Sequence, residues 1–362
     1  MISPSSRSGA CCPNDQRALA VAMEVLLLRS WKLWLGIVIS IVFLYLALRG
    51  LDFAGFWITV HRANYWWLIP GIAIYFAAVW ARTWRWHYML RHVKQIPMRR
   101  LFPVVVIGYM GNNVYPARAG EVLRSYILKR REAVPVSVSL ATVVLERLFD
   151  GLVMLLFVFV TLPFAQLPNG YDVLVSVFSV IFLVALVVFL ALAIRPVRMS
   201  RVYAWLVDRV VPAGWRPRVH GLFDRFIEGL QSLRSPRELV FIFFSSTLIW
   251  LCETTKYWFV MWAFYPAMYA PFTVLMLMTA VVNLFTTLPS TPGYVGTFDA
   301  PGIAILVAYG VPKTIAAGYT LVLHIALWLP ITLLGALFML LDHVGWGDFG
   351  RAVEERGLEV SP

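Results

Sequence analysis

Three charged residues, Glu146, Arg147 and Asp150, interrupt a long apolar segment in the first half of the chain. In a helix Glu146 and Asp150 share one face because they are four residues apart, whereas Arg147 lies about 100° away around the axis. Two carboxylates on one face could form an acid–base pair, or could form ion pairs with the nearby Arg118 and Arg124. Because buried charges are usually paired, we favour structural pairing, with a role in substrate or proton handling as the alternative.

The composition is that of a multi-pass membrane protein. Of the 362 residues, 60% are hydrophobic and only 14% are charged, and the mean hydropathy is +0.75. This is too little polar surface for a soluble globule. The three cysteines, Cys11, Cys12 and Cys252, cannot build a disulfide framework or a typical zinc site. A phosphate-binding GxxxxGK[ST] loop is absent from the sequence, and we expect no cofactor or metal.

The hydrophobic pattern predicts an all-α polytopic fold with about six full spans. A spanning helix needs about 20 apolar residues. We expect a disordered or misannotated N-terminus over 1–30, with Met23 as an alternative start, a transmembrane domain over 31–342, and a cytoplasmic tail over 343–362. The predicted spans are 31–48, 65–87, 138–162, 171–194, 238–263 and 316–341.

Two further apolar segments, about 101–131 and 272–309, are broken by Gly, Pro and Asn. If each returns to the side from which it entered, 26 of the 31 Lys and Arg residues fall on one side. The segment 82–100, with all of its Arg residues, is counted on this side. Cytoplasmic loops carry the excess of Lys and Arg, so the count predicts two opposed re-entrant hairpins in the cell membrane, with both termini in the cytoplasm.

The tips of the two hairpins have similar residues, and they predict a polar cavity. Broken helix at membrane depth is tolerated only where protein or water covers it. Paired Gly/Pro-interrupted segments in the two halves point to an inverted repeat with a binding site between them. The first tip carries Asn112, Asn113, Arg118 and Glu121, and the second carries Asn283 and Asp299.

Arg118 is the strongest candidate for contact with a substrate. A planar guanidinium suits bidentate binding of a phosphodiester, although Arg118 could instead pair with Glu121 or Glu146. Arg124, further from the tip, is more typical of an interfacial anchor.

Polar residues of the later spans have weaker claims on a substrate. Glu253 and Lys256 are three residues apart, which favours an intrahelical ion pair over a cavity-lining role. His324 is expected to hydrogen-bond to a neighbouring helix rather than to relay protons. Hydroxyl groups near the second tip could solvate a headgroup or simply allow close helix packing; they belong to Thr286, Thr287, Ser290 and Thr291.

The segment 195–237 combines arginines with large apolar residues. This pattern predicts amphipathic helices at the membrane surface that attract anionic lipid. Because the arginines flank spans, where they set orientation, we expect no nucleic-acid binding.

Four ordered motifs resemble the lysylphosphatidylglycerol synthase transmembrane-region family, also called flippase-like or UPF0104-type membrane proteins. They are RTWRW at 82–86, GNNVYPARAGEVLRSYILKRR at 111–131, ATVVLERLFDG at 141–151 and NLFTTLPSTPGYVGTFD at 283–299. The resemblance runs from about residue 30 to 342 and implies movement of lipids or lipid-linked headgroups between leaflets. Members that modify lipids carry an additional soluble aminoacyltransferase domain. This chain ends about twenty residues after its last predicted span, so the synthase activity is not implied.

We therefore expect a transporter, not an enzyme, that moves an anionic phospholipid or a polyprenyl-phosphate-linked lipid. One alternative is a membrane-embedded enzyme in which Glu146 or Asp150 is the base and Arg118 holds the lipid phosphate. Another is a non-transporting partner of a separately encoded glycosyltransferase or aminoacyltransferase. The sequence does not distinguish passive movement from transport driven by an ion gradient.

Overall fold

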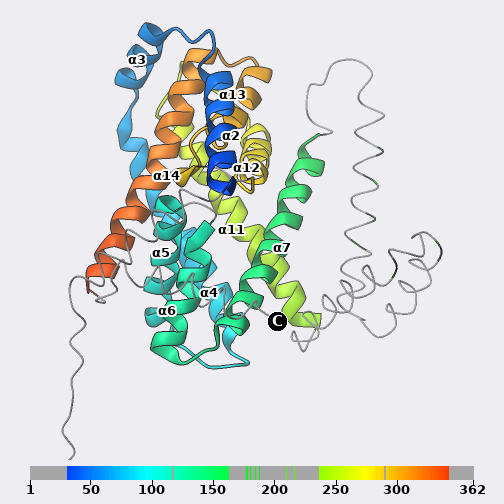
Figure 1. Cartoon of the computed structure of the whole chain (residues 1–362). Coiled ribbons are helices and arrows are strands. Elements are labelled where there is room, and N and C mark those ends of the chain that lie inside the picture. Colours follow the sequence, from blue (N-terminus) through cyan, green and yellow to red (C-terminus); the bar gives the residue numbers. More distant parts are fainter. Residues whose placement is uncertain are drawn as a thin grey trace, which may run out of the picture.

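The protein is described by a computed structural model over residues 31–115, 118–162, 236–288 and 291–341, with six single positions between 177 and 216. All regular secondary structure in these ranges is helical, as predicted (Figure 1). The expected N-terminal segment, the span 171–194, nearly all of the segment 195–237 and the C-terminal tail lie outside the described residues.

The first predicted span forms α2 (Trp31–Leu48), and the chain then turns sharply into α3 (Phe53–Arg62). The axes of the two helices differ by 88°. Gly50 makes the turn possible because it adopts a positive φ of 71°. Asp52 caps α3 by accepting a hydrogen bond from the backbone N–H of Ala54 at 3.0 Å.

Four long helices form the frame of the molecule. They are α4 (Leu68–Leu90), which follows the 3-10 turn η1 (Tyr65–Trp67), α7 (Val136–Thr161), α11 (Pro236–Trp262) and α14 (Lys313–Leu341). Among the described helices, length and apolar composition identify two as membrane-crossing, α11 and α14, or three if the bent α2–α3 pair is one span. The helices α4 and α7 have 23 and 26 residues but carry charged residues in their interiors.

The first broken segment is an antiparallel helical hairpin of α5 (Met98–Val114) and α6 (Ala119–Glu132). Its helices approach closely because both present glycine. A Cβ atom on Gly120 would lie 1.9 Å from the carbonyl oxygen of Gly108, and one on Gly111 would lie 2.8 Å from the Cα of Gly120. Arg118 begins α6 in the left-handed conformation, with φ 54°, which places it at the tip of the hairpin.

The second broken segment has the same helix–break–helix form. The helix α12 (Phe272–Phe285) is followed by a 3-10 turn, η4 (Pro292–Tyr294), and by α13 (Asp299–Ala308). This hairpin also packs against α2. The hydroxyl of Ser40 accepts a hydrogen bond from the backbone N–H of Thr291 at 3.1 Å, and a Cβ atom on Gly296 would lie 2.6 Å from the Ser40 carbonyl oxygen.

The two hairpins lie in opposite halves of the molecule and meet at their tips. In Figure 1, α12 and α13 lie in the upper half and α5 and α6 in the lower half. Arg118 at the first tip donates a hydrogen bond to the carbonyl oxygen of Thr286 at the second, at 3.1 Å. A Cβ atom on Gly293 of η4 would lie 3.7 Å from the Asn113 carbonyl oxygen. The broken segments therefore enclose a site between their tips.

Basic residues form contacts at both ends of the molecule. At one end Lys313 donates a hydrogen bond to the carbonyl oxygen of Arg49 at 2.5 Å. At the other end Glu132 at the end of α6 forms ion pairs with Lys94 at 2.9 Å and Arg100 at 3.2 Å. The hydrogen bond from Lys94, and then that from Arg100, lower the pKa of Glu132 below its ordinary value.

The glycine contact in the first hairpin leads to a direct test. We expect Gly120→Ala to lower the stability of the detergent-purified protein by at least about 1–3 kcal/mol, because the added methyl group forces α5 and α6 apart. Gly151→Ala is the matched control, since no described atom lies within 4 Å of a Cβ at that position in α7. It should change stability by no more than about 1 kcal/mol, in the favourable direction. Thermal unfolding measures both. Equal midpoints for the two variants would contradict the close packing of the hairpin.

Candidate functional site

Two arginines of α4 lie at the centre of a buried polar network. Arg82 is 8% exposed and Arg85 is 1% exposed, and α4 continues beyond them to Leu90 without interruption. The predicted span 65–87 contains both arginines, whereas the count of Lys and Arg by side assigns them to the cytoplasm; their burial within an uninterrupted α4 agrees with the span and not with the count. The signal that could have identified them is their spacing of three residues, which puts both on one face of a helix that continues the preceding apolar run.

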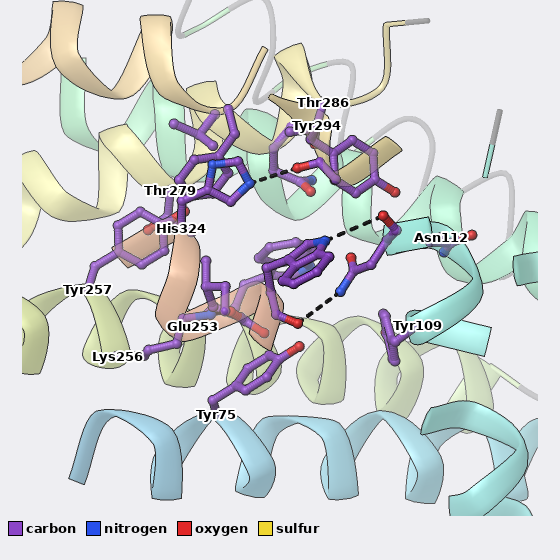
Figure 2. Close-up of a pocket in the computed structure, with 18 of the residues that line it drawn as sticks. Tyr75, Tyr109, Asn112, Glu253, Lys256, Tyr257, Thr279, Thr286, Tyr294 and His324 are labelled. Carbon is purple, nitrogen blue, oxygen red and sulfur yellow. Dashed lines mark hydrogen bonds and ion pairs between the residues drawn. The ribbon is translucent and has the colours of Figure 1, made fainter. Parts of the chain in front are cut away.

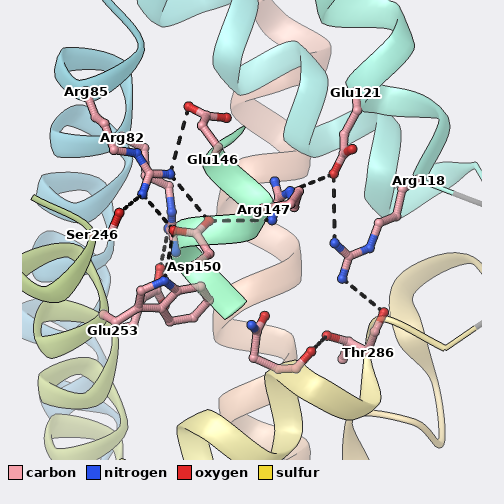
Figure 3. Close-up of polar contacts among 12 residues, drawn as sticks. Arg82, Arg85, Arg118, Glu121, Glu146, Arg147, Asp150, Ser246, Glu253 and Thr286 are labelled. Atoms are coloured by element: carbon pink, nitrogen blue, oxygen red, sulfur yellow. Dashed lines mark hydrogen bonds and ion pairs between the residues drawn. The ribbon is translucent and has the colours of Figure 1, made fainter. Parts of the chain in front are cut away.

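Arg85 joins α4 to α7 and α11. Its guanidinium donates to both carboxylate oxygens of Asp150, at 2.6 and 3.3 Å, and to the hydroxyl of Ser246, at 2.5 Å. The indole of Trp250 also donates to Asp150, at 3.1 Å. Figure 3 shows Arg85, Ser246 and Asp150 converging from three helices. The pairing expected for Asp150 is therefore present, but its main partner is Arg85 rather than an arginine of the hairpin.

Glu146 holds the first hairpin against α7. Its carboxylate accepts a hydrogen bond from Arg124 of α6, and both side chains are buried. The guanidinium of Arg124 also lies over the ring of Trp86, 4.6 Å from its centroid. The predicted pairing of Glu146 with an arginine of the hairpin is confirmed, with Arg124 as the partner. Arg124 thus forms an ion pair inside the molecule and does not serve as an anchor at the membrane surface.

Glu253 of α11 binds two cations at once. It accepts a hydrogen bond from Lys256, as the spacing predicts, and a second from Arg82 at 2.5 Å. The ammonium group of Lys256 lies over the ring of Tyr75, 4.5 Å from its centroid. All of these side chains are buried. The single carboxylate therefore compensates two positive charges.

Near the hairpin tips a second carboxylate is shared in the same way. Glu121 forms ion pairs with Arg147 at 2.9 Å and with Arg118 at 3.8 Å (Figure 3). Arg147 is also 3.8 Å from Asp150, which already binds Arg85. Arg118 and Arg147 are partly buried, with side chains 23% and 31% exposed, and they share a single nearby carboxylate.

Asn113 and His324 hold the tips to the last helix. The amide of Asn113 donates to the Thr332 hydroxyl at 2.9 Å. His324 is 2.9 Å from the carboxylate of Asp299 through Nδ1 and 2.7 Å from the carbonyl oxygen of Gly293 through Nε2. The predicted hydrogen bond of His324 to a neighbouring helix is confirmed. Asp299 also accepts from the backbone N–H of Gly296 at 2.9 Å, and so stabilises the second tip.

A cavity of about 170 Å³ lies where the two tips face α4, α11 and α14. Figure 2 shows its polar side chains pointing inward from several elements. Among the described residues that line it, four are cationic and one is a carboxylate: Arg82, Arg118, Arg147, Lys256 and Glu253. Arg82 and Lys256 are buried, so their charges are screened far less than charges on a surface. We refer to this space as the cationic cavity.

Seven of the twelve predicted site residues line the cationic cavity: Asn112, Asn113, Arg118, Arg147, Glu253, Lys256 and Asn283. Four others, Glu121, Arg124, Glu146 and Asp150, belong to the ion pairs around it. Asp299 lies behind His324. Sequence reasoning missed Arg82 and several aromatic residues of the lining, namely Tyr75, Tyr109, Trp250, Tyr294 and Trp328. Of the hydroxyl residues near the second tip, Thr286 lines the cavity, whereas Thr291 contacts Ser40 of α2.

Because Glu253 compensates two cations, replacing it alone should lower stability more than replacing it together with one of those cations. We expect Glu253→Gln to destabilise the protein by about 3–5 kcal/mol, because it leaves Arg82 and Lys256 buried without an anion. The double variant Glu253→Gln/Lys256→Met should recover part of this loss, because one of the uncompensated charges is gone. Thermal unfolding of the purified protein compares them. A double variant less stable than Glu253→Gln would contradict the ion-pair assignment.

Comparisons with known proteins agree with the resemblance seen in the sequence. The chain is 27% identical over 288 residues to a UPF0104 membrane protein of Methanothermobacter thermautotrophicus, covering 75% of this chain and 83% of that protein. It is 23% identical over 273 residues to a UPF0104 membrane protein of Methanocaldococcus jannaschii, covering 71% and 79%. It is also 24% identical over 266 residues to glycosyltransferase AglD of Haloferax volcanii, covering 66% of this chain but 42% of AglD.

The family model described as the lysylphosphatidylglycerol synthase transmembrane region matches residues 33–335. This match contains both hairpins, the buried ion pairs and the whole lining of the cationic cavity. The chain is therefore an integral membrane protein that belongs to the lysylphosphatidylglycerol synthase transmembrane-region family.

Proposed function

We propose that this protein moves an anionic lipid between the two leaflets of the membrane. The observation that carries the proposal is the cationic cavity at the junction of the two hairpin tips. Four cationic side chains and one carboxylate line it within the described part of the chain. A lipid phosphate that enters this space meets an uncompensated positive charge at the depth where crossing is most costly for an ion.

Arg118 is the residue best placed to bind the phosphate. It lies at the first tip, where its guanidinium touches the Thr286 carbonyl oxygen and shares Glu121 with Arg147. Since Glu121 cannot neutralise both arginines, a phosphate bound between them would supply the missing negative charge. Guanidinium groups bind phosphate oxygens in a bidentate manner, and the buried setting strengthens each contact.

The hairpins provide a route from both leaflets in this proposal. Six full spans would surround two hairpins that enter from opposite faces, with both termini in the cytoplasm of a cell-membrane protein. The basic end with Lys94 and Arg100 would be cytoplasmic, and the end with Arg49 and Lys313 would be outside, as the positive-inside rule predicts. The similar tips support an inverted repeat, in which access to the central site alternates between sides.

The match to AglD supports a second candidate function. A chain that resembles part of a glycosyltransferase could assist a separately encoded enzyme of that kind without moving lipid itself. A transport assay separates these two functions, because an assisting protein would move no lipid on its own. It would also co-purify with its enzyme. Release of a product from the lipid in the same vesicles would instead identify an enzyme.

Leaflet exchange in proteoliposomes tests the proposed transport. We expect phosphatidylglycerol labelled on an acyl chain to exchange faster than in empty vesicles, as measured by a dithionite quench of the outer leaflet. Arg118→Gln should slow this exchange by about tenfold or more, which corresponds to the loss of one charge-assisted hydrogen bond. Labelled phosphatidylcholine is the comparison lipid, since its headgroup carries a compensating positive charge.

Arg62→Gln is the matched control for this assay, because Arg62 is an exposed arginine at the end of α3 and does not line the cationic cavity. Its exchange rate should equal that of the unmodified protein. Equal slowing by both arginine variants would contradict a specific role of the cavity. No exchange of phosphatidylglycerol or polyprenyl phosphate would contradict transport.

Site-directed labelling tests the proposed orientation. Single cysteines that replace Lys94 and Lys129 in a Cys-free protein should react with an impermeant maleimide only after the cytoplasmic side is opened. A cysteine that replaces Lys313 should react from outside in intact cells. Lys94 and Lys129 lie at one end of the molecule and Lys313 lies at the other. Lys129 follows the first hairpin tip within α6. Labelling of position 129 from outside would show that the first hairpin crosses the membrane.

A further inference from the structure

A second, larger cavity adjoins the cationic cavity. It has a volume of about 660 Å³ and lies between α2, α3, the second hairpin and α14. Its walls are mainly aliphatic and aromatic, and include Leu44, Phe56, Val114, Ile303, Leu321 and Ile325. None of the described residues that line this apolar cavity is a Lys or an Arg. The two spaces therefore differ sharply in chemistry although they are neighbours.

Four residues line both cavities and form a thin partition between them: Asn113, Gly293, His324 and Trp328. Hydrogen bonds hold this partition together. The indole of Trp328 is 3.4 Å from the Asn113 carbonyl oxygen, and His324 is 2.7 Å from the Gly293 carbonyl oxygen. His324 is labelled in Figure 2 among the side chains that line the cationic cavity. The partition between the cationic space and the apolar one thus consists of side chains and of backbone from the two hairpin tips.

We propose that the two cavities bind two parts of one lipid, with the phosphate in the cationic cavity and one hydrocarbon chain in the apolar cavity. This inference rests on the proposed transport of an anionic lipid and names where its chain lies. The shared boundary of the two spaces argues for one amphiphilic occupant. An anion alone would leave the apolar cavity empty, and an uncharged chain alone would leave Arg118 and Arg147 uncompensated.

The volumes also define the class of lipid. The cationic cavity of about 170 Å³ is the smaller space, and the charged and aromatic side chains around it are largely fixed by mutual contacts. It suits a phosphate with a compact substituent and not an oligosaccharide. The apolar cavity of about 660 Å³ accepts an extended chain. The ligand that fits both is a lipid phosphate with a small headgroup.

Ligand-induced stabilisation of the detergent-purified protein tests this division, with three probes at equal concentration. They are inorganic phosphate, farnesyl phosphate and farnesol, which carry the charge alone, the charge and chain together, and the chain alone. A ligand that binds only the folded protein raises the unfolding midpoint. We expect farnesyl phosphate to bind at least about tenfold more tightly than either of the other probes, because it also buries its chain.

Leu321→Trp fills the apolar cavity and is the decisive variant, with Leu329→Trp as its matched control. Both leucines belong to α14, but only Leu321 lines the apolar cavity, whereas Leu329 is 42% exposed. We expect Leu321→Trp to reduce binding of farnesyl phosphate to the level of inorganic phosphate, and Leu329→Trp to leave it unchanged. Should Leu321→Trp unfold without ligand, Ile325→Trp replaces it, because Ile325 lines the same cavity and is 49% exposed.

The outcomes separate this inference from the transport proposal. Full binding of farnesyl phosphate by the cavity-filling variant overturns the chain site. Equal stabilisation of the unmodified protein by inorganic phosphate and farnesyl phosphate also overturns it, yet leaves the cationic cavity as an anion site. No response to either phosphate would remove the basis of the proposed function itself.

Discussion

Ionised side chains buried in hydrocarbon require partners, and this requirement determines how the helices of the protein are joined. An unpaired charge at membrane depth costs at least about 2.5–3.5 kcal/mol on insertion scales. Arg85 of α4 therefore binds Asp150 of α7, and Arg124 of α6 binds Glu146 of α7. These pairs attach the first hairpin to the long helices. The rotation of α4 and α7 about their axes is fixed as a result, because a turned helix would expose a charge to lipid.

Ion pairing is complete around Asp150 and Glu146 and incomplete at the hairpin tips. Asp150 and Glu146 are each surrounded by arginine, whereas Arg118 and Arg147 share Glu121. The excess positive charge of Arg118 and Arg147 faces the cationic cavity, which both tips line. The close Gly108–Gly120 contact contributes by keeping the first hairpin narrow. The cationic cavity thus lies where the fully paired structural ion pairs end.

Local spacing in the sequence predicted those features that depend on local geometry. The broken segments, the Glu253–Lys256 pair and the tip position of Arg118 follow from the placement of Gly, Pro and charge along one helix. The predicted span 65–87 contains Arg82 and Arg85, but the count of charge by side assigns them to the cytoplasm because an arginine after an apolar run is typical of a cytoplasmic loop. Only the tertiary partners Glu253 and Asp150 compensate the cost of burying them. The hydrogen bond between the two tips joins Arg118 to Thr286, which are 168 positions apart in the sequence. No local sequence pattern predicts such a contact. The span 171–194 lies outside the described residues, so the expectation of six spans stays a prediction.

The partition between the two cavities has the strength expected of a movable boundary. Its hydrogen bonds join Trp328 to Asn113 and His324 to Gly293, and each contributes about 0.5–1.5 kcal/mol net. Opening it therefore costs on the order of a few kcal/mol, far less than separating the buried ion pairs on the other side of the cationic cavity. A headgroup that moves between the tips would have the buried ion pairs, a rigid charged wall, on one side. On its other side would be the hydrogen-bonded partition, which is a weak wall. In the proposed transport, the weak wall is the one that faces the apolar cavity, so the chain of the lipid would stay in an apolar space while its phosphate passes the arginines.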